Sequence, residues 1–316
     1  MQHRGARPAV TPADSGLAFS VVPLAARDGT VLEGWWITPA DGVRRPDLAV
    51  VVLAHAEDDS ASLAQHIGGK ARMLRHAEYL HRAGFIVLLF DFRSYGGSTG
   101  TRTSGGYLEQ QDLEGAIRLA RERALGAPIA VLGEGMGATV GLAVTAQDPT
   151  VTCLVADSPN PTWDATLFAA PAIRESWWTR LGVSSFASSF VASKFPEEFQ
   201  GNKPVALAAA PLAGMRPVML VFGREDESMP NTARVALAKA LGPSNLTWAW
   251  SAPSARRLAV YDAAPADYEA RVLEFLDAAI AQWARRKAVV DSVAGNEARD
   301  LKSGSVDSVQ VPLPGY

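Results

Sequence analysis

The sequence predicts an α/β fold in which helices cover both faces of a mostly parallel central sheet. Three fully apolar runs, at residues 48–54, 85–90 and 129–132, have the length and composition of strands that are buried on both sides. Segments with helical spacing of apolar residues lie between these runs. Such an alternation over 316 residues is typical of α/β proteins.

Composition excludes several classes of protein. Apolar residues make up 48% and charged residues 20%, which is usual for a folded globular chain, and the net charge of -3 does not favour nucleic acid or an anionic membrane as partner. A single cysteine excludes an internal disulfide. No window reaches the roughly 18 unbroken apolar residues of a membrane helix, and the first residues lack the apolar stretch of a signal peptide. We expect a soluble cytoplasmic protein.

The elements follow one another in a regular order. Residues 1–16 are polar with proline and glycine, which predicts a flexible leader. Asp28 and Gly29 form a hairpin signal between two short β-like stretches. With the three apolar runs, the other strand candidates give a sheet of about eight strands: residues 19–22, 31–37, 151–156, 218–222 and 246–252.

Helical stripes fill the gaps between the strands. Leu74, Ala77 and Leu80 share one face of a predicted helix, and residues 113–120 show the same spacing. The closing helix has the clearest apolar stripe, formed by Tyr268, Val272, Phe275, Leu276, Ala279 and Trp283.

Two segments depart from this alternation within a main domain of residues 17–286. Residues 159–203 are rich in aromatic side chains, which predicts either a helical insertion over a pocket or extra helices packed on the core. Residues 287–316 are polar and predict a flexible C-terminal tail.

The motif with chemical content is GEGMG at residues 133–137, where a buried strand ends and a helix begins. It matches the nucleophile elbow Gly-x-Ser-x-Gly, whose outer glycines are needed because side chains there would collide with the neighbouring strand or helix. At this point the chain resembles the α/β-hydrolase superfamily, in particular its bacterial esterase- and peptidase-like branch. The resemblance extends over residues 19–283 and includes three further landmarks and the start of the last helix, at residues 53–56, 91–98, 216–226 and 265–268.

The resemblance also implies that the catalytic triad is degenerate. Gly135 stands at the nucleophile's position and has no side chain with which to attack. Arg257 stands where the histidine is expected, and a guanidinium does not act as a base. All five histidines precede residue 82, although the family's histidine follows the acid. Only the acid remains, at Asp226, and we expect Arg257 to turn toward it.

The family comparison further implies an oxyanion pocket formed by His55, Ala56, Glu57 and the backbone N–H of Met136. His55 has a structural role in the family, with catalysis as the less favoured alternative. Glu57 and the two aspartates after it are expected to form a solvated loop rather than a cation site. Cys153 is expected to be a buried, inert thiol rather than a substitute nucleophile. We expect no metal and no cofactor.

Two functional hypotheses follow. The first is a pseudoenzyme that binds a small apolar or carbonyl-bearing ligand in the former active-site cleft, or that acts as a protein-interaction module. The second is an active esterase, amidase or peptidase with a nonstandard catalytic site, because most relatives of this kind are hydrolases. The loss of both nucleophile and base favours the first.

Overall fold

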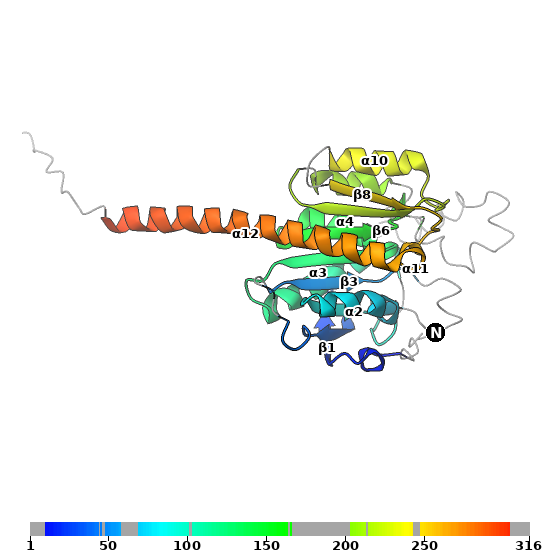
Figure 1. The fold of residues 1–316 in the computed structure, drawn as a ribbon, viewed down its shortest axis with the longest axis horizontal. Helices are drawn as coiled ribbons and strands as arrows, with labels where there is room; N and C mark the ends of the chain where they lie inside the picture. Colours follow the sequence, from blue (N-terminus) through cyan, green and yellow to red (C-terminus); the bar gives the residue numbers. More distant parts are fainter. Residues whose placement is uncertain are drawn as a thin grey trace, which may run out of the picture. The chain divides into compact units, whose positions relative to one another are not determined.

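The structure is a computed structural model that describes residues 10–43, 45, 48–57, 69–100, 103–163, 165, 203–212, 214–242 and 247–303. The chain divides into two compact units, Met1–Ile280 and Ala281–Tyr316. The first unit contains the whole described sheet (Figure 1). Every predicted site residue also falls within its bounds. The second contains the C-terminal part of the last helix.

An eight-stranded sheet forms the centre of the first unit, with strand order β1-β2-β4-β3-β5-β6-β7-β8. Only the pairings of β2 with β1 and with β4 are antiparallel, and the other five are parallel. The strands are β1 Phe19–Ala25, β2 Val31–Ile37, β3 Val50–Ala54, β4 Ile86–Phe90, β5 Ile129–Glu134, β6 Val151–Asp157, β7 Val218–Gly223 and β8 Thr247–Ala252. The predicted α/β architecture is confirmed.

The first two strands form the predicted hairpin. Ala25 pairs with Val31, and the turn between them includes Gly29 at φ 86°. The Thr30 N–H donates to Asp28 Oδ1 at 3.1 Å. The Asp-Gly step therefore closes this turn as its chemistry predicts.

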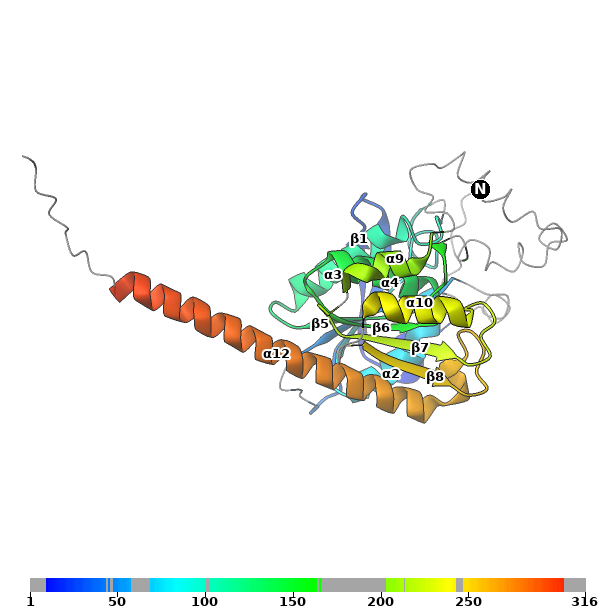
Figure 2. The ribbon, with the colours of Figure 1, turned by 90° about the horizontal axis from the view of Figure 1, so that it is seen from above.

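Helices cover both faces of the sheet (Figure 2). One face carries α3 Glu109–Arg123, α4 Met136–Gln147, α9 Val205–Ala209 and α10 Asn231–Leu241. The other carries α2 Leu74–Arg82 and the first part of α12 Pro265–Ser303. The short elements are the 3-10 turns η1 Pro12–Ser15, η2 Gly69–Met73 and η3 Ala210–Leu212, and the helix α11 Val260–Ala263.

Alternate side chains of the buried strands enter two separate apolar cores. Val52 and Val131 pack with α3 and α4 on one face, whereas Leu53 and Leu132 pack with α2 and α12 on the other. Both faces are covered, so β3, β4, β5 and β6 are buried at every position. This burial explains why the sequences of β3 and β4 are apolar throughout.

The ends of the chain add detail to the predicted boundaries. Residues 12–15 of the expected leader form η1, and α12 continues through residues 287–303 of the expected tail. Nearly all of the predicted insertion at 159–203 lies outside the described residues, except for its two ends. Among the described residues, no helix combines the length and apolarity needed to span a membrane.

Candidate functional site

The elbow after β5 places Gly135 in a backbone conformation that residues with a side chain rarely adopt. Its φ is 53° and its ψ is −113°. The Gly135 N–H donates to the carbonyl oxygen of Asp157 at the end of β6, at 2.9 Å, which fixes the turn above the sheet edge. Holding a non-glycine residue in such a conformation costs of order 1–3 kcal/mol. Glycine removes that cost.

The outer glycines of the motif permit close backbone packing. A Cβ on Gly133 would lie 2.4 Å from the Gly137 carbonyl carbon. A Cβ on Gly137 would lie 2.0 Å from the Ala54 carbonyl oxygen at the end of β3. Both contacts are with backbone, which has little freedom to move away. The predicted reason for these two glycines is confirmed.

The space that a nucleophile would occupy is already filled. A Cβ built on Gly135 would lie 2.8 Å from Glu57 Oε2, 2.9 Å from Ala56 Cβ and 3.2 Å from Arg257 Nη2. The structure thus brings together four residues that the sequence analysis assigned to the site from widely separated segments. Met136 adjoins them as the first residue of α4.

Glu57 is the residue that closes this site. The Met136 N–H donates to Glu57 Oε2 at 2.7 Å, and Arg257 Nη2 donates to Glu57 Oε1 at 2.6 Å. Arg257 Nη2 also donates to Asn160 Oδ1 at 2.8 Å. The expectation that Glu57 belongs to a solvated loop was wrong, because its side chain is only 8% exposed. Asp58 and Asp59 lie outside the described residues.

The expected pair between Arg257 and Asp226 was also wrong. None of the ion pairs among the described residues joins them, and Arg257 contacts Glu57 instead. Asp226 Oδ1 accepts hydrogen bonds from the Ser228 N–H at 2.9 Å and from the Ser228 hydroxyl at 2.5 Å. This local turn holds the aspartate on its own loop, while the Glu57 carboxylate at the start of α4 offers Arg257 a partner. Asp226 Oδ2 is buried without a hydrogen-bond partner among the described residues.

His55 has the structural role that the resemblance implies. Its ring is fully buried, and Nε2 accepts the Phe92 N–H at 3.0 Å. Nε2 must therefore be unprotonated, so Nδ1 carries the proton and donates to the Ala56 carbonyl oxygen at 2.6 Å. Both ring nitrogens are bound to backbone, and neither is free to accept a proton from a substrate.

Cys153 lies in the middle of β6 and is fully buried. Burial raises the pKa of its thiol to about 12, so it stays protonated at neutral pH. The prediction that this thiol is buried is confirmed.

The sequence analysis missed two features of this region. Asn160 is held by its N–H, which donates to the Thr139 hydroxyl of α4 at 2.9 Å, and its side chain orients Arg257. Glu134, the residue before Gly135, is fully buried and contacts Arg72, Arg75 and the His76 ring. No spacing signal in the sequence marks either feature, because the partners come from different elements.

Charge explains how Glu134 tolerates full burial. Burial acts to raise the pKa of its carboxyl, but the Coulombic attraction of Arg75 and the hydrogen bond from His76 lower it far below the ordinary value. Asp157 has the opposite balance. Burial, followed by repulsion from Glu134, raises the pKa of Asp157 to about 7.

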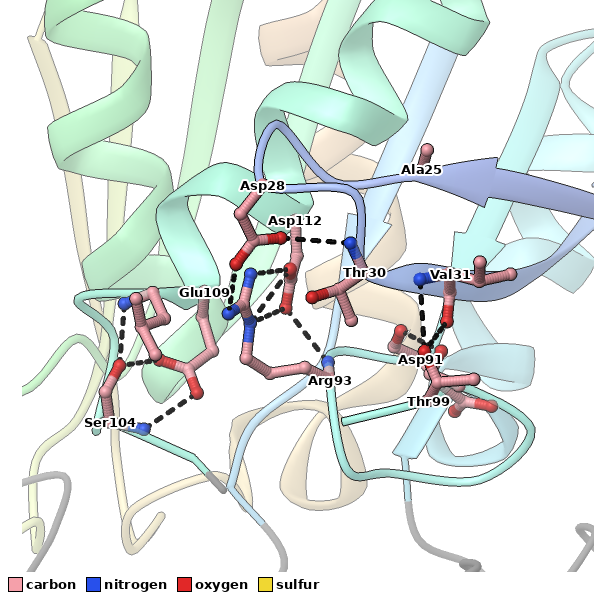
Figure 3. A network of polar contacts seen from close by, with 12 residues as sticks. Ala25, Asp28, Thr30, Val31, Asp91, Arg93, Thr99, Ser104, Glu109 and Asp112 are labelled. Atoms are coloured by element: carbon pink, nitrogen blue, oxygen red, sulfur yellow. Dashed lines mark hydrogen bonds and ion pairs between the residues drawn. The ribbon is translucent and has the colours of Figure 1, made fainter. Parts of the chain in front are cut away.

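The turn after β4 lies at the same edge of the sheet and is held by a separate network (Figure 3). Arg93 donates through Nη2 to Asp112 Oδ1 at 2.7 Å and through Nη1 to Asp28 Oδ2 at 2.8 Å. Lys70 forms ion pairs with Asp91 and with Glu33. These charged side chains bind one another, so the network shapes the loop rather than offering groups to a ligand.

Comparison with known proteins agrees with this fold. The family model described as serine aminopeptidase, S33, matches residues 49–203. The uncharacterized protein YfhR of Salmonella typhimurium is 30% identical over 225 residues, which cover 70% of this chain and 67% of that protein. The chain belongs to the α/β-hydrolase superfamily. The alignments with two Escherichia coli YfhR proteins span only 41% and 32% of those relatives.

Solved structures of the superfamily share the fold. The esterase Pf2001 of Pyrococcus furiosus superimposes with a TM-score of 0.68 at 23% identity, over 89% of this chain and all of that one. The α/β-hydrolase GrgF of Penicillium gives a TM-score of 0.62 at 17% identity, over 84% of this chain and all of GrgF.

Proposed function

We propose that this protein is a non-catalytic member of the α/β-hydrolase superfamily that binds a small molecule at its former catalytic centre. One observation carries the proposal. The Glu57 carboxylate accepts the Met136 N–H, which in this fold is the donor that stabilises the oxyanion of the reaction. A carboxylate in that position excludes a substrate carbonyl oxygen from the donor.

The other catalytic groups support the same function. Gly135 offers no nucleophile, and Arg257 offers no base. Both nitrogens of His55 are bound to backbone, so it does not replace the missing histidine. A binding role needs none of these groups, but it does need polar donors that face a common point, and Met136 and Arg257 provide them.

A small molecule fits this site better than a protein surface does. Met136 and Asn160 are almost completely buried, and the Glu57 side chain is nearly so. A partner protein binds an exposed patch, whereas buried donors are reached by a ligand that enters the fold. An active hydrolase with a nonstandard catalytic residue is the competing function, and the match to the serine aminopeptidase model favours it.

A fluorophosphonate probe separates the two functions. We expect no covalent labelling of the native protein and no hydrolysis of p-nitrophenyl esters above background. The reason is that the described residues at the elbow include no nucleophilic side chain with a base beside it. Mass spectrometry of the intact protein measures the labelling. Stoichiometric labelling that is lost on heat unfolding would establish an active hydrolase and reject the proposal.

A repaired variant provides the positive control. Gly135→Ser with Arg257→His restores two triad positions, but the Cβ of the new serine would lie 2.8 Å from Glu57 Oε2. We therefore expect esterase activity only when Glu57→Ala is added to these two changes. Triad members act as a unit, so the single variants should remain inactive.

A further inference from the structure

We propose that the ligand of this site is a small carboxylate, and that Glu57 is a tethered occupant of the ligand's carboxylate subsite. This inference rests on the proposed binding function and adds the chemical class of the ligand. It follows from which atoms hold Glu57, from the charge that Glu57 balances and from the space that Gly135 leaves open.

The two oxygens of the Glu57 carboxylate have different donors. Oε2 accepts the Met136 N–H at 2.7 Å, and Oε1 accepts Arg257 Nη2 at 2.6 Å. Met136 begins α4, a helix of 12 residues whose dipole also favours a negative charge at its N-terminus. The backbone donor and the guanidinium thus form a two-point cradle whose geometry fits a carboxylate.

Asn160 keeps the cradle in place when its occupant leaves. Its Oδ1 accepts Arg257 Nη2 at 2.8 Å, and its own N–H is fixed by the Thr139 hydroxyl of α4 at 2.9 Å. The Thr139 hydroxyl in turn donates to the Gly135 carbonyl oxygen at 3.0 Å. Asn160 is therefore a positioning residue that ties the guanidinium to the elbow.

Charge decides between an anionic and a neutral ligand. The Arg257 side chain is 18% exposed, and its ion-pair partner among the described residues is Glu57. If a neutral ester or amide displaced Glu57, the guanidinium would remain without a counter-charge in a largely buried position, which is unfavourable. A carboxylate ligand replaces both the hydrogen bonds and the charge.

Gly135 makes room for the carboxylate. A side chain at this position would place its Cβ 2.8 Å from the oxygen that accepts the Met136 N–H. This separation is shorter than a van der Waals contact, so a side chain at residue 135 would force the carboxylate to shift away from its present position. The absence of a side chain therefore favours the carboxylate subsite, besides removing the nucleophile.

Glu57 competes with a free ligand because it is covalently attached. Its effective concentration at the cradle is high, so it weakens the binding of any external carboxylate. Removing the Glu57 carboxylate should expose the site without altering its donors. The consequence is that a variant should bind more tightly than the native protein.

The test uses the full chain and sodium acetate, with sodium chloride for ionic strength and acetamide as the neutral analogue. We expect Glu57→Ala to bind acetate saturably, with a dissociation constant at least tenfold lower than that of the native protein. Isothermal titration calorimetry measures the affinity, and the thermal midpoint should rise with acetate but not with acetamide. Glu57→Ala with Arg257→Ala should lose the binding.

Three results would overturn the inference. These are no saturable acetate binding by folded Glu57→Ala, equal affinity of native protein and variant, or undiminished binding after Arg257→Ala is added. If Glu57→Ala does not fold, the near-isosteric Glu57→Gln is used with a smaller expected gain in acetate affinity, because its neutral amide still occupies the cradle but competes less strongly for the guanidinium. The fluorophosphonate assay reports on the absence of catalysis, so a failure there is distinct from a failure here.

Discussion

The turn after β4 and the elbow after β5 follow the two strands that flank β3 in the sheet, and both carry sequence landmarks of the superfamily. In the first, Asp91 and Arg93 are buried and bound by other parts of the fold. In the second, the outer glycines remain, while the middle position has lost its side chain and is closed by Glu57 and Arg257. The two regions therefore differ in what their landmark residues contribute to stability.

This comparison indicates which residues the fold requires for its stability. Arg93 neutralises a carboxylate that is completely buried, so the fold depends on its charge. A catalytic serine makes no such contribution, and its strained backbone position costs stability. Its absence leaves the elbow intact, provided that the neighbouring charges find new partners, as Glu57 and Arg257 do.

The largest expected effect is in the turn after β4. Arg93→Ala should lower the free energy of unfolding by about 3–5 kcal/mol, because it leaves the Asp112 carboxylate buried without its cation. Urea denaturation followed by circular dichroism measures this. Asp28→Ala is the matched control and should cost about 1 kcal/mol or less, because the Asp28 carboxylate is 35% exposed. Similar losses for the two variants would contradict the proposed role of Arg93.

An intermediate effect is expected at the elbow. Gly135→Ala should destabilise the protein by about 1–3 kcal/mol, because φ is 53° and the new Cβ meets the Glu57 carboxylate. The same change made in a Glu57→Ala background should cost less than in the native protein, since only the backbone strain remains. Thermal and urea unfolding of the four proteins give this comparison. Equal costs in both backgrounds would show that Glu57 does not crowd the position.

A pH-dependent effect is expected at Asp157, whose carbonyl oxygen holds the elbow and whose carboxyl accepts a hydrogen bond from the Ser158 hydroxyl at 2.8 Å. Its pKa is raised to about 7, from about 4 in an unfolded chain. Between these values the folded protein holds a proton that the unfolded chain has released, so the stability that this group contributes falls as pH rises from about 4 to 7.

Asp157→Asn should remove this dependence while keeping an acceptor for Ser158. The difference in unfolding free energy between variant and native protein should shift in favour of the variant by up to about 1.4 kcal/mol per pH unit in that range. Urea midpoints measured from pH 4 to pH 8 test this. Parallel pH profiles for the two proteins would mean that Asp157 titrates normally.

Much of the fold could be predicted from local sequence. The runs at residues 48–54 and 85–90 became strands because continuous apolar sequence has one stable place in such a protein, between two layers of helices. The hairpin at Asp28 and Gly29 followed from turn chemistry that involves only adjacent residues. The glycines at 133 and 137 were explained by close packing that the motif itself implies.

The partners of the charged residues could not be predicted in this way. Sequence position suggested that Arg257 binds Asp226, but the local turn made by Ser228 holds the aspartate, and Glu57 reaches the guanidinium from 200 positions away in the chain. Similarly, the sequence around Glu134 does not indicate that Arg72, Arg75 and His76 contact its carboxylate.

The sequence by itself determined the strands, the elbow and the absence of a serine and a histidine from their places, because these depend on residue identity and short-range periodicity. Only the tertiary structure decided that Glu57 occupies the oxyanion donor and pairs with Arg257. An ion pair depends on distance in space, and the sheet brings together side chains whose separation along the chain carries no information about that distance.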